Sequence, residues 1–207
     1  MSDFKTVLDE TPFQTAGPFL HIGCLPNAIN IEGIFETDLG VKPFANKDYD
    51  KFITITGSVF DGDGKALDDI MLESWQSDEN GVYSPECGFA RFVPDSLTKK
   101  FNLYTLKPGF INEIDGKAQS PHILLSISSR GLNMTLNTRI YFEGDDLTND
   151  PLLSNVKNSR NDVSSLIAKK IDEDIYLFDI FLQGDRETIF LDTVSYTHLT
   201  LPTSDLV

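Results

Sequence analysis

Apolar and polar residues alternate along much of the chain with the two-residue period that is typical of β-strands. The segment 53–59 is the clearest case, because Ile53, Ile55 and Val59 alternate with small polar residues. The same kind of pattern predicts further strands over 70–75, 101–106, 122–128, 138–142, 175–182 and 188–192.

One segment, 162–170, has a helical pattern instead. Asp162 is a good helix-capping residue, and Val163, Leu166 and Ile167 would form a single apolar stripe. Many short strands with one short helix predict an all-β fold, an antiparallel two-sheet β-sandwich. The pattern does not say which strands pair.

The first strand ends at Asp61-Gly62-Asp63-Gly64. Two aspartates in such a run also suggest calcium, but the remaining ligands of a calcium loop do not follow. A tight turn is the better interpretation.

Composition narrows the function classes. The 207 residues suit one domain with a single core, and the net charge of −15 argues against nucleic acid or an anionic membrane as a partner. An acidic protein that binds an anionic substrate needs a local cation, so its few arginines matter.

The two cysteines, Cys24 and Cys87, are too few for a disulfide framework. Free thiols in a reducing cytoplasm are the expectation, and one disulfide is the alternative. No apolar run reaches the roughly 18–20 residues of a membrane span, and the N-terminus lacks the pattern of a signal peptide.

Two residues have the chemistry of a ferric site, because the phenolate of Tyr83 and the imidazole of His122 are suitable ligands for a hard metal ion. A His-x-His pair on a strand would point two rings at one metal, but the second place is Leu124. The loop after Gly109 offers Ile111 and its neighbours, none of them Tyr or His. Two protein ligands are too few for a catalytic metal, which needs about three or more.

Other residues have simpler interpretations. Trp75 suits a core or an interface, and Arg139 a structural or interfacial position. The acidic clusters 145–146 and 172–174 are expected on the solvated surface. No convincing nucleophile motif accompanies the histidines.

Five short motifs occur in an order that resembles the intradiol aromatic-ring dioxygenases, and in particular the alpha chains of its two-chain members. The resemblance extends from about residue 10 to about residue 192. The motifs are TPFQTAGPF at 11–19, ESWQSDENGVY at 73–83, TLKPG at 105–109, PHI at 121–123 and SRGLN at 129–133.

The resemblance implies a β-sandwich and a division of labour between chains. In the family, the beta chain holds non-haem Fe³⁺ with two Tyr and two His. Tyr83 and His122 match the first Tyr and first His, while Ile111 and Leu124 stand at the second ones. These four are therefore expected to be vestigial iron-site positions, in a chain that binds no metal and contains no catalytic residue of its own.

The resemblance also implies a partner and a reaction. The partner is an iron-bearing beta chain in a hetero-oligomer, and the reaction is intradiol cleavage of 3,4-dihydroxybenzoate by O₂ to 3-carboxy-cis,cis-muconate. Two alternatives stay open: a catalytically silent assembly or binding module, and an autonomous intradiol dioxygenase with a rearranged iron site.

Substrate contacts are expected at Thr15, Ala16, Gly17, Pro18 and Arg130. On residue type alone, the first four suit either a tight turn or the wall of a narrow pocket. The resemblance favours the pocket wall, facing iron in the beta chain. Arg130 would meet the substrate carboxylate in two parallel hydrogen bonds, and a surface ion pair is the alternative.

The resemblance ends near Asp192. We therefore expect a sandwich domain over 1–194 and a tail over 195–207 without a family counterpart. The tail is typical of translated adapter DNA, and a genuine extension is the alternative.

Overall fold

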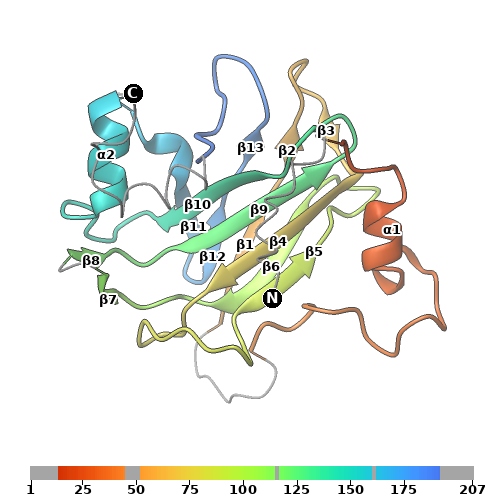
Figure 1. The fold of residues 1–207 in the computed structure, drawn as a ribbon, viewed down its shortest axis with the longest axis horizontal. Coiled ribbons are helices and arrows are strands. Elements are labelled where there is room, and N and C mark those ends of the chain that lie inside the picture. Colours follow the sequence, from red (N-terminus) through yellow and green to blue (C-terminus); the bar gives the residue numbers. More distant parts are fainter. Residues whose placement is uncertain (1–13, 45–51, 115–116, 160–161, 192–207) are drawn as a thin grey trace, which may run out of the picture.

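The chain is mainly β-structure in the part that the computed structural model describes, which is residues 14–44, 52–114, 117–159 and 162–191 (Figure 1). The strands are β1 (Phe52–Gly57), β2 (Val59–Phe60), β3 (Ala66–Leu67), β4 (Ile70–Gln76), β5 (Phe89–Phe92), β6 (Phe101–Leu106), β7 (Ile111–Ile114), β8 (Lys117–Gln119), β9 (Ile123–Ser129), β10 (Leu136–Phe142), β11 (Ile167–Asp172), β12 (Ile175–Leu177) and β13 (Ile180–Phe181). The helices are α1 (Leu20–Cys24) and α2 (Pro151–Ser159), with 3₁₀ turns η1 (Asn27–Ile29) and η2 (Ser164–Leu166). The predicted all-β class is confirmed.

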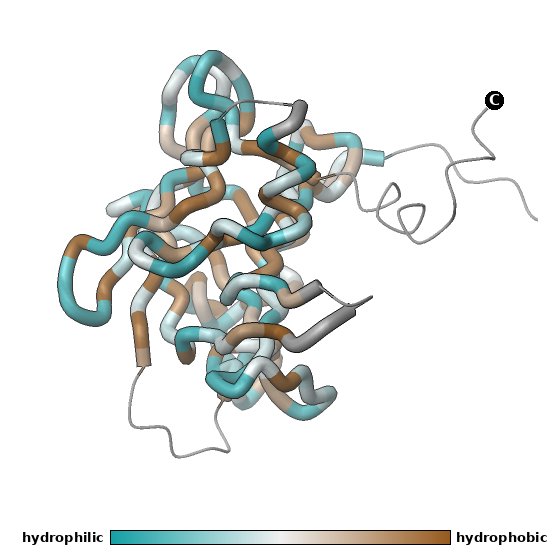
Figure 2. Tube along the Cα trace, turned by 90° about the vertical axis from the view of Figure 1, so that its left-hand side faces the viewer, coloured by the Kyte–Doolittle hydropathy of each residue, from teal (hydrophilic) through white to brown (hydrophobic). Residues whose placement is uncertain are grey.

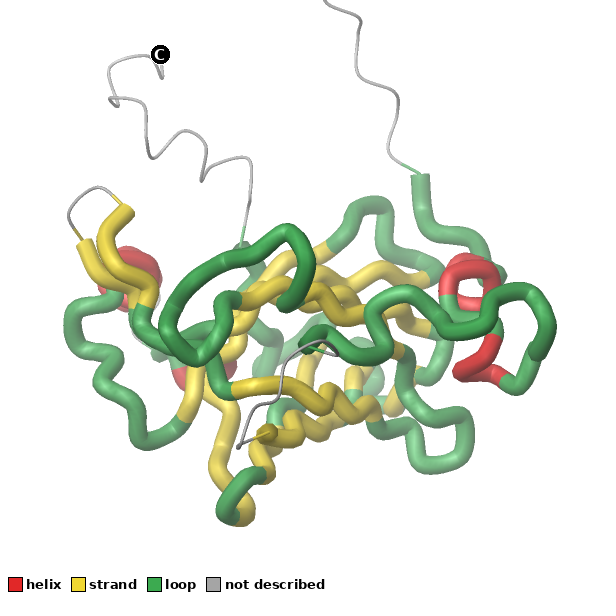
Figure 3. Tube along the Cα trace, turned by 90° about the horizontal axis from the view of Figure 1, so that it is seen from below, coloured by secondary structure: helices red, strands yellow, loops and turns green. Residues whose placement is uncertain are grey.

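An eight-stranded sheet dominates the fold, in the order β5-β4-β9-β10-β11-β12-β1-β6. Two smaller sheets, β13-β2-β3 and β7-β8, accompany it. The edge strands β5 and β6 approach each other, since the rings of Phe92 and Phe101 lie 5.7 Å apart. The large sheet is therefore nearly closed on itself, and its strands lie in two layers in Figure 3.

The expectation of purely antiparallel pairing is wrong. Strand pairs β10–β11, β12–β1 and β13–β2 are parallel, so the sheets are mixed. Parallel neighbours need a long crossover between them, and α2 with η2 supplies one between β10 and β11. Residue patterns report which face of a strand is buried, but not which neighbour it pairs with.

Alternating burial explains why these segments are strands. In β9, Ile123, Leu125 and Ile127 are buried, and the residues between them are partly exposed. Inward-facing residues of both layers form one main core, and a second cluster lies around Tyr141 and Leu153. In Figure 2, hydrophobic and hydrophilic segments alternate along the trace, and the loop at the top of the view is mostly white and teal.

The helix predicted over 162–170 is wrong. The Asp162 carboxylate accepts the Ser164 amide at 2.8 Å, but only the 3₁₀ turn η2 follows, and its N-cap residue is Val163. Ile167 and Ala168 then pair with β10, and this pairing overrides the local helical pattern.

Among the described residues, the longest helix is α2. Asp150 caps it by accepting the Leu152 and Leu153 amides, each at 3.0 Å, and Pro151 occupies its first turn. Asp followed by Pro is a strong helix-start signal, so the sequence did contain the information needed to place this helix.

Two C-terminal strand predictions need correction. The segment 175–182 divides into β12 and β13, because the Asp179 carboxylate accepts the Ser58 amide at 3.0 Å between them. Residues 188–191 form no strand, although Leu191 donates its amide to the Asn137 carbonyl at 2.7 Å. Asp192 lies outside the described residues, as does the tail 195–207.

Several smaller predictions are settled. The Asp61 carboxylate accepts the Asp63 and Lys65 amides, which confirms the turn. Cys24 and Cys87 are free thiols, as predicted. Asp145 is not a solvated surface acid, because it is largely buried and pairs with Lys107 at 2.5 Å. Within the described residues, no helix is long and apolar enough to cross a membrane.

Candidate functional site

Near the start of strand β9, a row of side chains crosses strands β5, β4, β9 and β10 on the outer face of the sheet. Strand register places Phe89 opposite Trp75, Trp75 opposite Leu124, and Leu124 opposite Arg139. The ring of Tyr83 stacks on Trp75 with centroids 6.2 Å apart and planes 13° apart. Tyr83 thus joins this row, although it comes from a loop.

The loop that carries Tyr83 is held backbone against backbone. A Cβ added at Gly81 would lie 1.8 Å from the carbonyl oxygen of Phe110, and one at Gly109 would lie 2.3 Å from that of Glu79. Neither position has room for a side chain. The loop between β4 and β5, which carries Tyr83, and the loop between β6 and β7 are therefore fixed together. This contact brings the Tyr83 loop beside the buried Ile111.

His122 is buried just before β9 and is 1% exposed. Its Nδ1 lies 2.8 Å from the carbonyl oxygen of Ser120, so Nδ1 must carry the proton and donate. Burial, and after it the positive charge of Arg139, lowers the pKa of His122 to about 4. The ring is therefore neutral at pH 7 and packs 5.7 Å from the ring of Tyr141.

Arg139 is the centre of the polar contacts at this end. Its Nη1 donates to Gln119 Oε1 at 2.9 Å and to the Tyr141 hydroxyl at 3.3 Å. Tyr141 in turn donates to Asp150 at 3.2 Å, which is the carboxylate that caps α2. The sequence analysis did not predict this chain of hydrogen bonds, because it depends on strand pairing. The available signal was that Arg139 and Tyr141 are two residues apart on one strand and therefore face the same side.

The four positions that were predicted to be vestigial iron-site positions lie in this region, but they do not fit a ferric ion. Ile111 and Leu124 have no donor atom, and His122 already donates from one ring nitrogen. Burial raises the pKa of Tyr83, and the charge of Arg139 lowers it by a smaller amount. A fixed guanidinium close to both Tyr83 and His122 opposes a second cation. Among the described residues, no group of three or more His, Cys, Asp or Glu could hold a metal.

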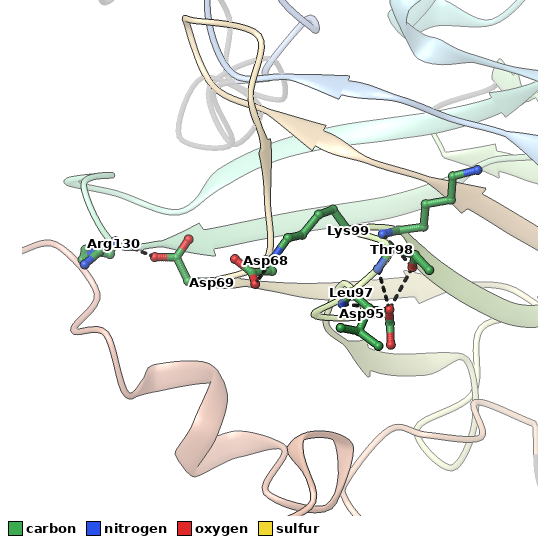
Figure 4. Close-up of polar contacts among 8 residues, drawn as sticks. Asp68, Asp69, Asp95, Leu97, Thr98, Lys99 and Arg130 are labelled. Atoms are coloured by element: carbon green, nitrogen blue, oxygen red, sulfur yellow. Dashed lines mark hydrogen bonds and ion pairs between the residues drawn. The ribbon is translucent and has the colours of Figure 1, made fainter.

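The predicted substrate contacts meet at the opposite end of β9. The Gly131 amide donates to Thr15 Oγ1 at 2.7 Å, which ties the N-terminal loop to the turn after β9. Arg130 precedes this glycine and forms an ion pair with Asp69 at 3.0 Å. Figure 4 shows this pair beside a second one, between Lys99 and Asp68.

The ion-pair alternative for Arg130 is therefore observed, and it leaves the side chain accessible, since 64% of it is exposed. The loop itself is exposed at Thr15, Gly17 and Pro18, and half-buried at Ala16. A Cβ at Gly17 would meet nothing within 4 Å, so close backbone approach within this chain does not explain that glycine.

Strand β9 separates the two groups of residues. His122 precedes the strand and Arg130 follows it, so about eight residues at roughly 3.3 Å each put them about 26 Å apart. In Figure 1, helix α1 lies at one end of the sheet and the β7–β8 hairpin at the other. The Thr15–Arg130 group and the predicted iron-site positions therefore cannot form one site within a single chain.

Comparison with known proteins identifies the family. A family model for dioxygenases matches residues 33–184, so the chain belongs to the intradiol dioxygenase family.

Two relatives give a more specific similarity than the family model does. The chain is 36% identical over 203 residues to the protocatechuate 3,4-dioxygenase alpha chain of Pseudomonas putida, covering 90% of this chain and 98% of that protein. It is 32% identical over 205 residues to the alpha chain of the same name from Burkholderia cepacia, covering 90% and 99%.

Solved structures share the fold at lower identity. Catechol 1,2-dioxygenase from Pseudomonas arvilla C-1 superposes with a TM-score of 0.54 and 18% identity, covering 72% of this chain and 58% of the other. The dioxygenase domain of a carbohydrate-binding fusion protein from Streptomyces sp. SirexAA-E gives 0.52 and 21%, covering 70% and 86%. At these identities the likeness is one of fold.

Proposed function

We propose that this chain is the non-iron-binding alpha chain of a protocatechuate 3,4-dioxygenase, an oxidoreductase of aromatic-compound catabolism. The assembled enzyme would cleave 3,4-dihydroxybenzoate with O₂, between the two hydroxyl-bearing carbons, to 3-carboxy-cis,cis-muconate. The similarity to two such alpha chains along nearly the whole length supports the assignment.

The observation that carries the proposal is the separation of the two ends of β9. One end has exposed polar residues suited to a carboxylate, and the other has ligand positions that do not fit iron. Such a chain can complete a substrate pocket only if another chain supplies the metal. We therefore assign the Fe³⁺ to a beta chain, in a hetero-oligomer with this one.

Within that pocket, the chain's own residues would bind and orient. Thr15 to Pro18 would form one wall, held in place by the bond between Thr15 and Gly131. Arg130 would receive the substrate carboxylate, for which its guanidinium is geometrically suited. Because the chain carries a net charge of −15, such a local cation is needed to hold an anionic substrate.

Reconstitution tests the proposal. Oxygen uptake with 3,4-dihydroxybenzoate should require both this chain and an iron-bearing beta chain, and neither should be active alone. An iron-bearing beta chain that is fully active without this chain would leave it as an assembly module. Stoichiometric iron and activity in the isolated chain would instead establish an autonomous dioxygenase.

The domain limits and the compartment are part of the proposal. We propose one sandwich domain over residues 1–194 and a dispensable tail over 195–207, so removing the tail should leave the unfolding temperature unchanged. A drop of more than roughly 4 °C, the shift that about 1 kcal/mol produces, would contradict this. The free thiols Cys24 and Cys87 support a reducing cytoplasm.

A further inference from the structure

Asp69 lies opposite Arg130 as a continuation of the pairing between β4 and β9. The first residue of β4, Ile70, pairs with Ser129, the last residue of β9. In antiparallel strands, the residue before one member of such a pair stands opposite the residue after the other. The two side chains meet there, because Arg130 Nη2 lies 3.0 Å from Asp69 Oδ2 (Figure 4). The strand register therefore sets this ion pair.

The carboxylate of the pair is better fixed than the guanidinium. Ser129, which is buried, donates its hydroxyl to the Asp69 carbonyl oxygen at 3.2 Å, so the backbone of Asp69 is held against the end of β9. The Asp69 side chain is 28% exposed, whereas that of Arg130 is 64% exposed. A long arginine side chain also has many more rotamers to lose than a short aspartate. Asp69 is thus suited to restrain Arg130, and the reverse does not hold.

Within the described residues, Asp69 is the one polar partner of the Arg130 guanidinium. The backbone after Arg130 is held separately, since the Gly131 amide donates to Thr15 Oγ1 at 2.7 Å. The contact with Asp69 engages one guanidinium nitrogen, and an arginine has five N–H donors. Donors therefore remain for a second carboxylate while Asp69 stays in place.

We propose that Asp69 is a positioning residue, which holds the Arg130 guanidinium ready for the substrate carboxylate and so sets the preference for a carboxylated catechol over an uncharged one. This inference rests on the proposed function, which assigns the carboxylate contact to Arg130. A side chain that is restrained before binding loses less entropy when the ligand arrives. Asp69 acts on the substrate only through Arg130, so its effect belongs to binding.

The charge of Asp69 has an opposing effect, because it repels the substrate carboxylate. Both side chains of the ion pair reach solvent, and exposed charges are screened over about 8 Å at physiological ionic strength. The restraint on the arginine side chain is not screened in this way. We therefore expect positioning to outweigh repulsion, and the sign of the change in KM decides between them.

The test is steady-state oxygen uptake by the reconstituted enzyme with Asp69→Asn in this chain. KM for 3,4-dihydroxybenzoate should rise about 3- to 10-fold, which corresponds to ordering one long side chain on binding. The loss should appear in KM rather than in kcat. Catechol has no carboxylate, so its KM should change much less. A defect in folding or assembly would affect both substrates, and the split between them therefore identifies positioning.

Two further variants are matched to this one. Asp68→Asn removes the same charge one residue away, from the ion pair with Lys99, and should leave KM for both substrates unchanged. Asp69→Glu keeps the negative charge at the same position, so its KM for 3,4-dihydroxybenzoate should lie closer to wild type than that of Asp69→Asn.

A double variant shows whether Asp69 acts through Arg130. In the Arg130→Ala background, Asp69→Asn should produce no further rise in KM, because the side chain that it positions is gone. An unchanged or lower KM in Asp69→Asn, an equal rise for catechol, or an equal rise in Asp68→Asn would overturn the inference. Failure of the wild-type complex to oxidise 3,4-dihydroxybenzoate would instead refute the proposed function itself.

Discussion

An arginine lies near each end of strand β9, and the two have different surroundings: Arg139 of β10 pairs with Leu124 near the start of β9, and Arg130 follows the end of β9. Arg139 is half-buried and bonded to Gln119 and Tyr141 on a face whose loops touch backbone to backbone. Arg130 is mostly exposed and pairs with a carboxylate, Asp69. The first is fixed by its surroundings, and the second remains accessible to a ligand.

Under the proposed function, this difference has a meaning, because one scaffold would bind no metal and still contribute to the reaction. At the His122 end, aliphatic Ile111 and Leu124 stand where donor atoms would be needed, and a guanidinium lies near the remaining candidates. At the Arg130 end, no metal is required, because binding an anion needs only a cation and a firm loop. Predictions that disturb each end separately therefore test the contrast.

The largest effect should come from breaking the packed end. Gly81→Ala places a Cβ 1.8 Å from the Phe110 carbonyl oxygen and also strains a backbone φ of +78°. Strain alone costs roughly 1–2 kcal/mol, and the overlap adds roughly 1–3 kcal/mol more. Urea unfolding should show a loss of about 3 kcal/mol or more.

Gly64→Ala is the matched control, because Gly64 has the same φ of +78° but open space around its Cβ. It should lose only the strain component, about 1–2 kcal/mol. Equal losses at the two glycines would mean that the contact between the Tyr83 loop and the Phe110 loop contributes nothing.

The next effect concerns the accessible end. Arg130→Ala in the reconstituted enzyme should lower kcat/KM for 3,4-dihydroxybenzoate by about 10- to 100-fold, the worth of a charge-assisted contact of roughly 1.5–3 kcal/mol. Catechol has no carboxylate, so it should lose much less. Oxygen uptake on both substrates, at equal iron content and equal assembly, measures this.

Arg186→Ala provides the control for a lost surface charge. Arg186 is exposed, and its guanidinium carbon lies 4.2 Å from the centroid of the Phe181 ring. Phe181 belongs to the β13-β2-β3 sheet and not to the large sheet that contains β9. It should leave both substrates unaffected. Equal losses for catechol and 3,4-dihydroxybenzoate in Arg130→Ala would make Arg130 an ordinary structural residue.

Sequence patterns predicted the β-class well because strand faces are a local property. The alternation at Ile53 and Ile55 placed β1 to within a residue or two. The helical pattern near Ile167 failed because Ile167 and Ala168 find partners on β10, a contact that no local pattern records. The sequence analysis did not predict helix α2, although Asp150 and Pro151 form a helix-start signal.

The candidate site, too, could be predicted from the sequence only in part. Residue type was sufficient to single out Tyr83 and His122, and the structure places them in one region with Leu124. The contact of Arg139 with Gln119 and the pairing of Arg130 with Asp69 could not be predicted, because each joins segments that are distant in sequence. Both depend on the strand order, which the sequence pattern left open.

The buried end should also be sensitive to acid. His122 has a pKa of about 4 in the folded chain and 6.5 as its ordinary value. Between these values the unfolded chain binds more protons, so stability falls as pH decreases from about 6.5 toward 4. At pH 5 the loss from this group should be about 2 kcal/mol, at roughly 1.4 kcal/mol for each pH unit.

His122→Asn isolates this contribution, because its amide can still donate to the Ser120 carbonyl but does not titrate. Urea unfolding at pH 7 and pH 5 should show that wild type loses about 2 kcal/mol more than the variant. Equal pH dependence in both proteins would show that His122 is not held neutral in the fold.

The smallest effect should come from the ion pair at the accessible end. Exposed pairs are worth about 0–1 kcal/mol, so Asp69→Asn should change the free energy of unfolding by less than about 1 kcal/mol. Asp68→Asn, which breaks the adjacent pair with Lys99, is a matched control with a similar expectation. A loss above about 2 kcal/mol in Asp69→Asn alone would show that Arg130 is as firmly built into the fold as Arg139, and the contrast between the two ends of β9 would then be wrong.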